Sequence, residues 1–129
     1  MNSKQLRVLV IDNEPLVADS LVQVLNLFGY KALSLHSPNK AIEHISTEHC
    51  DLLVSDVVME PEMSGIDLAL EFGKLLPNCK VLLMSGNTLT ADLLKEAEKK
   101  GHFFDVLPKP VHPEIILDHL KSLAAAAPN

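Results

Sequence analysis

At 129 residues, the chain is long enough for one domain with a real core, and it leaves little for a second module. Hydrophobic residues make up 47% of it and charged residues 22%, and no apolar run approaches the roughly 18 residues of a membrane span. A net charge of -6 disfavours a direct nucleic-acid partner, because binding to phosphates requires a basic face. Residues 1–7 also lack the apolar core of a signal peptide, so we expect a soluble cytoplasmic protein.

Short apolar runs and helical periodicities alternate along the chain. The runs predict strands at residues 7–11, 31–35, 52–56, 80–84 and 103–107. Apolar residues at helical spacing, with Pro, Ser and Gly at the ends, predict helices at residues 15–28, 38–45, 65–76, 91–100 and 113–123. Because crossovers between parallel strands are right-handed, this alternation predicts a doubly wound α/β fold, a parallel sheet with helices on both faces. We expect one domain over residues 1–129 with its core at about 7–123, and an Ala-rich tail or the start of a linker at 124–129.

Polar side chains gather after four of the predicted strands. The set consists of Asp12, Asn13, Glu14, Asp56, Ser85 and Lys109. Because the carboxyl ends of parallel strands meet at one edge of a sheet, residues from distant parts of the sequence come together there. Each alone has an ordinary explanation as a helix cap, a turn residue or a solvated cation. Together, clustered carboxylates with one lysine predict a divalent-cation site, for which Mg²⁺ is suited, beside an anion site.

The cysteines and histidines show no metal-binding pattern. Cys50 and Cys79 lack a C-x-x-C spacing, so we expect buried or half-buried reduced thiols. The six histidines have no short metal-ligand spacing, and His112 is expected to cap the helix that begins at Pro113.

Five short motifs, in order, carry a resemblance to a known family. They lie at residues 8–15, 55–59, 63–65, 84–86 and 107–110. In these places the chain resembles the receiver domain of two-component response regulators, over residues 7–123 and in an apparently stand-alone, chemotaxis-regulator-like form. The resemblance implies a flavodoxin-like (βα)5 sheet with strand order 2-1-3-4-5.

The resemblance also implies a phosphoacceptor and a metal site. Asp56 would accept a phosphoryl group from a phosphohistidine of a sensor kinase or phosphotransfer protein, forming an aspartyl phosphate in a phosphorelay. Mg²⁺ would be held by Asp12, Asn13, Asp56 and the backbone carbonyl of Val58. Such a phosphoprotein is no enzyme in the usual sense, since it catalyses only its own phosphotransfer and dephosphorylation.

Further roles follow from the same resemblance. Lys109 and Ser85 would bind phosphoryl oxygens, and Gly86 would leave room for the phosphodonor. The peptide bond before Pro110 would be cis, which is cheap only before proline. Output would pass through altered docking of a downstream protein, commonly at residues 89–121, with the chain a monomer or weak homodimer.

Three departures from the family pattern affect these expectations. Asn13 stands where the family has an acid, which predicts weaker Mg²⁺ binding. Glu60 is an extra residue in the loop after Asp56, and we expect it to bulge outward. Val106 occupies the place of an aromatic residue that moves inward on phosphorylation, so this relay should be absent or muted, with Phe103 and Phe104 expected to be ordinary packing residues.

Two other functions remain as alternatives. A pseudo-receiver, a binding module of the same fold that works without phosphate, is supported by Asn13 and Val106 and opposed by the intact Asp56, Ser85 and Lys109. An aspartate-nucleophile phosphatase is disfavoured, because such enzymes place a second acid two residues after the nucleophile, where this chain has Val58.

Overall fold

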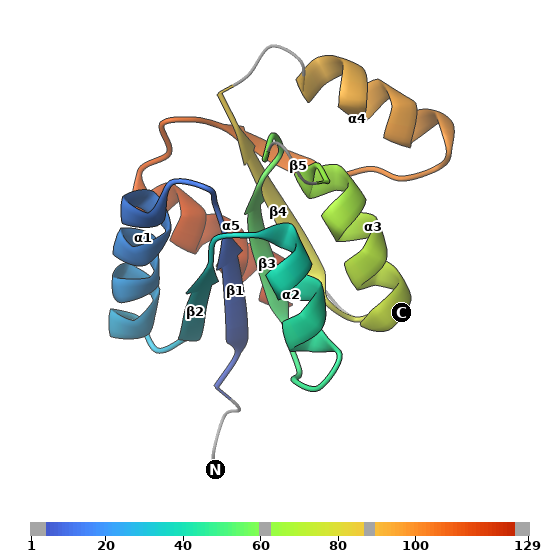
Figure 1. Ribbon diagram of the computed structural model, residues 1–129. Helices are drawn as coiled ribbons and strands as arrows, with labels where there is room; N and C mark the ends of the chain where they lie inside the picture. Colours follow the sequence, from blue (N-terminus) through green and yellow to red (C-terminus); the bar gives the residue numbers. More distant parts are fainter. Residues whose placement is uncertain (1–4, 60–62, 87–89, 126–129) are drawn as a thin grey trace.

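The computed structural model of the chain describes residues 5–59, 63–86 and 90–125. Five strands alternate with five helices over this range, as Figure 1 shows. The bounds are β1 (Arg7–Ile11), α1 (Pro15–Leu27), β2 (Lys31–Leu35), α2 (Pro38–Ile45), β3 (Leu52–Asp56), α3 (Gly65–Leu75), β4 (Lys80–Ser85), α4 (Thr90–Lys99), β5 (Asp105–Pro108) and α5 (Pro113–Ala125). The predicted extra residue Glu60, and Leu89 at the start of the expected partner face, lie outside the described residues.

The strands form one parallel sheet in the order β2-β1-β3-β4-β5, which confirms the predicted fold class and strand order. All five residues of β3 are buried, because this strand lies at the centre of the sheet with helices over both faces. Its last residue, Asp56, is aligned with Met84 of β4, and Ile11 of β1 is aligned with Ser55. The register therefore brings the ends of β1, β3 and β4 to one edge of the sheet.

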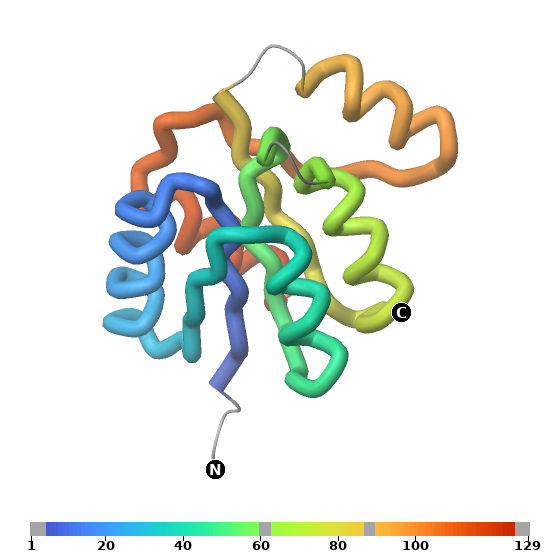
Figure 2. Tube along the Cα trace, viewed as in Figure 1, coloured from blue at the N-terminus to red at the C-terminus, as the bar shows by residue number. Residues whose placement is uncertain are grey.

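The core is divided by the sheet into layers on its two faces. In Figures 1 and 2, α1 and α5 lie on one face of the sheet, and α2 and α3 lie on the other. The first face holds the α1/α5 core: Val8, Val10, Ala18, Leu21, Leu25, Leu52, Val54, Leu82, Met84, Ile116, Leu117 and Leu120. The second holds the α2/α3 core: Leu9, Ile11, Ala41, Ile45, Cys50, Leu53, Met59, Leu68 and Phe72. Alternate residues of β1 thus enter opposite layers, as the period of two in a strand requires.

The last strand begins later than the sequence pattern predicts. Residues 103 and 104 were expected within it, but β5 runs over Asp105–Pro108 and its pairing with β4 starts at Leu82 with Asp105. Gly101, with a φ of +87°, ends the preceding helical turn, and the chain then crosses from the helix layer to the sheet edge. Phe103 lies in this crossing and is 75% exposed, so the expectation that it is an ordinary packing residue was wrong. For Phe104 the same expectation is confirmed, since it is half-buried and packs on a small apolar cluster.

Two smaller expectations are confirmed, the cap of α5 and the reduced thiols. His112 accepts a hydrogen bond on Nδ1 from the backbone N–H of Glu114 at 3.2 Å and so caps α5. Cys50 and Cys79 are free thiols, one buried and one half-buried. No helix among the described residues is long and apolar enough to cross a membrane.

Candidate functional site

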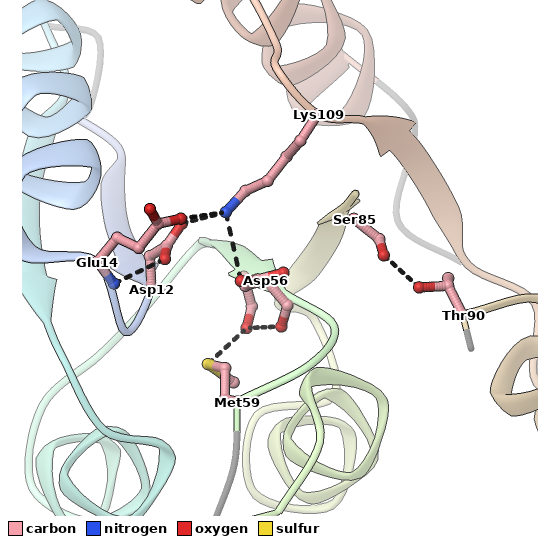
Figure 3. Close-up of polar contacts among 8 residues, drawn as sticks. Asp12, Glu14, Asp56, Met59, Ser85, Thr90 and Lys109 are labelled. Atoms are coloured by element: carbon pink, nitrogen blue, oxygen red, sulfur yellow. Dashed lines mark hydrogen bonds and ion pairs between the residues drawn. The ribbon is translucent and has the colours of Figure 1, made fainter. Parts of the chain in front are cut away.

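The carboxyl ends of four strands bring the predicted polar residues together. Figure 3 shows Asp12 after β1, Asp56 at the end of β3 and Lys109 after β5 converging at this edge, with Ser85 of β4 beside them. Asp12 is completely buried and Asp56 is only 8% exposed. Buried carboxylates are rare unless they have charged or hydrogen-bonding partners, so the arrangement requires compensation.

Lys109 supplies that compensation. Its Nζ atom lies 2.8 Å from Oδ2 of Asp12 and 3.3 Å from Oδ2 of Asp56. A third acid, Glu14, is 3.5 Å from the same ammonium group but is itself exposed. One positive charge therefore faces three negative ones, so the site is left with negative charge that attracts a cation.

The pKa values at the site reflect this imbalance. Burial raises the pKa of the Asp56 carboxyl above its ordinary value, and the negative charge of Asp12 adds to the increase while Lys109 opposes it. Burial alone would lower the pKa of the Lys109 ammonium, but its hydrogen bond to Asp12 and the charges of both carboxylates raise it. Lys109 therefore stays in its charged form, whereas the ionised form of Asp56 is less stable at this site than in water.

Backbone contacts help to hold two of the charged residues, Asp12 and Lys109, in place. Asp12 accepts a hydrogen bond on Oδ1 from the backbone N–H of Glu14 at 2.9 Å, so both of its oxygens have partners. The backbone N–H of Lys109 donates to the carbonyl of Ser85 at 3.0 Å. The peptide bond between Lys109 and Pro110 is cis, the form that the resemblance implies.

The loop after Asp56 passes directly against the start of α3. The backbone N–H of Gly65 donates to the carbonyl of Val57 at 2.7 Å, and a Cβ atom at position 65 would lie 2.0 Å from the carbonyl oxygen of Asp56. Only glycine fits there, because the obstacle is backbone. Ser64 then caps α3 by accepting from the N–H of Asp67 at 3.1 Å. Gly65, the glycine of the third family motif, therefore packs directly against the backbone of Asp56.

The hydroxyl of Ser85 is hydrogen-bonded to that of Thr90, and Figure 3 shows the two side chains pointing toward one another. Thr90 is the first residue of α4 and is only 7% exposed. Sequence analysis missed it, because the pattern placed the helix start at residue 91. The available signal was a threonine shortly after a strand-end serine, which alone indicates no more than a turn.

The remaining predicted residues differ in exposure and in their neighbours. Gly86 is exposed, and a Cβ atom there would meet Cβ of Lys109 at 3.4 Å. Asn13 is exposed and Val58 is half-buried. Val106 is half-buried and packs on a small apolar cluster shared by α3 and α4.

The donors expected for Mg²⁺ suit a hard cation. They comprise two carboxylates, one amide and one backbone carbonyl, all oxygen ligands, and the uncompensated negative charge favours such an ion. Within the described ranges, no three His, Cys, Asp or Glu side chains form a group that could hold a metal.

Comparisons with known proteins place the chain in a family. The sequence profile of the response regulator receiver domain matches residues 8–121. The chain is 28% identical over 121 residues to the response regulator receiver protein CpdR of Brucella abortus (strain 2308), covering 94% of this chain and 98% of CpdR. It is 28% identical over 103 residues to the DNA-binding transcriptional regulator NtrC of Azospirillum brasilense, covering 80% of this chain but only 21% of NtrC.

A solved structure gives the same result. The CheY-like response regulator receiver domain protein from Methanospirillum hungatei JF-1 superposes with a TM-score of 0.81 at 25% identity, covering 94% of this chain and 95% of that one. The family match spans nearly all of the described residues, and the fold and strand order agree with it. The chain therefore belongs to the response regulator receiver domain family of two-component systems.

Proposed function

We propose that the chain accepts a phosphoryl group on Asp56 from a phosphohistidine of a sensor kinase or phosphotransfer protein. The observation that supports this most is the position of Lys109, whose ammonium lies 3.3 Å from Asp56 and 2.8 Å from Asp12. A structural ion pair needs one carboxylate, whereas this lysine faces two buried ones at the strand ends where α/β proteins bind ligands. The cationic group is thus placed beside the candidate nucleophile.

The transfer is a displacement at phosphorus. A carboxylate oxygen of Asp56 attacks, the new O–P bond forms as the P–N bond of the phosphohistidine breaks, and the imidazole leaves with the electron pair and takes up a proton from water. Lys109 neutralises charge on the phosphoryl oxygens. Asp12 orients the lysine through their 2.8 Å contact. Gly86, where a Cβ atom would meet Cβ of Lys109 at 3.4 Å, would leave room for the donor.

Asp12, Asp56, the amide of Asn13 and the carbonyl of Val58 would hold Mg²⁺. When bound, the ion supplies positive charge that offsets the charge of the phosphoryl oxygens. Because Asn13 contributes no charge, the proposed site is one negative charge weaker than a site with an acid there.

Output begins at Ser85 in this proposal. Its hydroxyl is bonded to Thr90 before phosphorylation, and it would turn to the phosphoryl group afterwards, releasing the first residue of α4. Val106 is too stiff and small to perform the movement of an aromatic side chain. We therefore assign the first step of signalling to the Ser85 and Thr90 hydroxyl pair, with altered docking of a downstream protein on the α4 side as its consequence.

In the same proposal the protein acts in the cytoplasm as a monomer or weak homodimer, and it catalyses only its own phosphotransfer and dephosphorylation.

The test is incubation with acetyl phosphate and Mg²⁺, followed by intact mass measurement. Wild type should gain the mass of one phosphoryl group, removable by hydroxylamine, and chelation of the metal should prevent the gain. Asp56→Asn should show no gain, while the matched control Asp67→Asn, which alters an exposed acid of α3, should label like wild type.

Two outcomes would refute the proposal. An equal adduct on Asp56→Asn would place the acceptor elsewhere. Absence of any adduct on folded wild type, with acetyl phosphate and with a phosphohistidine donor, would favour a pseudo-receiver.

A further inference from the structure

We propose that Cys50 and Cys79 form an oxidation site, at which hydrogen peroxide joins the two sulfurs in a reversible intramolecular disulfide. The two Sγ atoms lie 3.8 Å apart although the residues are 29 positions apart in sequence. No role in phosphoryl transfer uses them, because they lie at the opposite end of the sheet from Asp56. The inference is therefore independent of the proposed function.

Neighbouring strands hold the two cysteines together. Cys50 lies just before β3 and Cys79 just before β4, and these strands pair from Leu52 with Lys80 onward. The backbone N–H of Lys80 donates to the carbonyl of Asp51 at 3.0 Å, so the two chains are also joined between the cysteines. Both side chains pack on the α2/α3 core, and the thiols thus face the same side of the sheet.

The geometry suits a disulfide. Cys79 precedes Lys80 by one residue and Cys50 precedes its partner Leu52 by two, so the cysteines are offset by one residue across the two strands. With strands about 4.8 Å apart and a rise of about 3.3 Å per residue, this diagonal gives a Cα separation of about 5.8 Å, which disulfides bridge. The sulfurs must approach by about 1.8 Å from their 3.8 Å separation to reach bonding distance, and rotation of the side chains can supply part of this movement. The Cys79 thiol already donates a hydrogen bond to the Cys50 sulfur, so the two sulfurs are in direct contact.

Openings lie on two sides of the pair, and a small oxidant reaches it from the side of Cys79, because Cys50 is only 1% exposed. Half-buried Cys79 lines an open groove of about 860 Å³ with Gly73 and Phe104 among its walls. Cys50 lines a smaller pocket of about 210 Å³ beside Arg7 and His49. The hydrogen bond from Cys79 lowers the pKa of the Cys50 thiol, which increases the fraction in the reactive thiolate form.

The reaction is a balanced two-electron oxidation. The S–S bond forms as the O–O bond of one hydrogen peroxide breaks, both sulfurs are oxidised and both oxygens are reduced. The two thiol protons leave with the oxygens as two molecules of water. A dithiol such as dithiothreitol reverses the change by thiol–disulfide exchange.

The experiment treats the purified full chain with a few equivalents of hydrogen peroxide at neutral pH. We expect a loss of two hydrogen masses, no alkylation by iodoacetamide, and a Cys50–Cys79 linked peptide on non-reducing digestion. Dithiothreitol should restore both the mass and the alkylation. The oxidised protein should unfold at higher temperature than the reduced one, because the bond closes a 29-residue loop in the unfolded chain.

Matched variants separate an intramolecular bond from ordinary thiol oxidation. The monomers of Cys79→Ser and of Cys50→Ala should each show no loss of two hydrogen masses after peroxide, because each retains only one cysteine. Oxygen addition or a disulfide-linked dimer as the main wild-type product would overturn the proposal, and so would two thiols that still alkylate fully after peroxide. The oxidised chain should also label with acetyl phosphate to the same extent as the reduced chain. A failure of labelling in both forms would refute the proposed function and leave the oxidation site standing.

Discussion

Replacing Gly65 by alanine should both destabilise the protein and impair phosphorylation of Asp56. The added Cβ atom would lie 2.0 Å from the carbonyl oxygen of Asp56 and 3.0 Å from Cα of Val57. A carbon and a carbonyl oxygen rarely approach within about 3.3 Å, so one backbone must retreat by on the order of 1.3 Å. Both neighbours are backbone atoms, and no flexible side chain can absorb the change.

The cost can be estimated from the contacts that the movement breaks. The 2.7 Å hydrogen bond from Gly65 to Val57 would be lost, which costs about 1 kcal/mol. Overpacking against backbone adds about 1–3 kcal/mol, and the lower entropy of the unfolded alanine chain returns about 0.4–1 kcal/mol. We expect a net loss of about 1–3.5 kcal/mol, which a domain of ordinary stability survives.

Urea unfolding followed by circular dichroism measures this loss. The matched control is Gly73→Ala in the same helix, where a Cβ atom would meet nothing within 4 Å. That variant should be more stable than wild type by about 0.5–1 kcal/mol, because alanine favours helix. Labelling of Asp56 by acetyl phosphate should slow in the Gly65 variant and stay unchanged in the Gly73 variant. Equal stability of the two variants, or normal labelling in both, would refute the steric reasoning.

Three further substitutions test the site. Asp56→Asn should raise the free energy of unfolding at pH 7 by about 1 kcal/mol, an ordinary size for one substitution. The raised pKa of Asp56 means that its ionised form destabilises the folded protein. The extra stability of the variant should therefore shrink as the pH falls toward 3.8 and the wild-type carboxyl takes up its proton. Asn13→Asp should lower the Mg²⁺ concentration for half-maximal phosphorylation, on the order of tenfold, because it adds a negative ligand. Thr90→Val should increase the phosphorylated fraction a few-fold, because it removes the hydrogen bond that holds Ser85 in the unphosphorylated arrangement.

Each of the three has its own control. For Asp56→Asn, the control is chemical denaturation of the variant and wild type at several pH values. If the extra stability of the variant grew as the pH fell, this would contradict the sign of the pKa shift. For Asn13, replacement by glutamine keeps an amide and should not tighten metal binding. For Thr90, replacement by serine keeps the hydroxyl and should behave like wild type; equal behaviour of valine and serine would contradict the role of the hydroxyl pair.

The fold could be predicted because local signals and burial agree over most of the chain. Pro15 begins α1 and Gly29, with a φ of +95°, follows its end, so both boundaries are marked by residues with special backbone preferences. The central strand β3 is apolar because both of its faces are buried. The edge strand β2 gives a weaker pattern since it is mostly half-buried or exposed.

What could not be predicted depends on contacts between distant segments. Phenylalanine is common in strands, yet Phe103 and Phe104 belong to the crossing from α4 to the sheet edge. The role of Thr90 requires knowing that α4 begins beside the end of β4. The close approach of Gly65 to Asp56 likewise exists only once the loop between them is folded.

The position of Asp56 on a fully buried strand limits how a signal can spread. β3 is paired on both sides and covered on both faces, so its amide protons should be among the slowest in the protein to exchange with deuterium. A strand that is so well protected can hold a reactive residue, Asp56, at its end without a change in its own backbone. Any change in exchange caused by phosphorylation should then appear in the segments beside the site, at Ser85 and in α4, and leave the centre of the sheet unaltered.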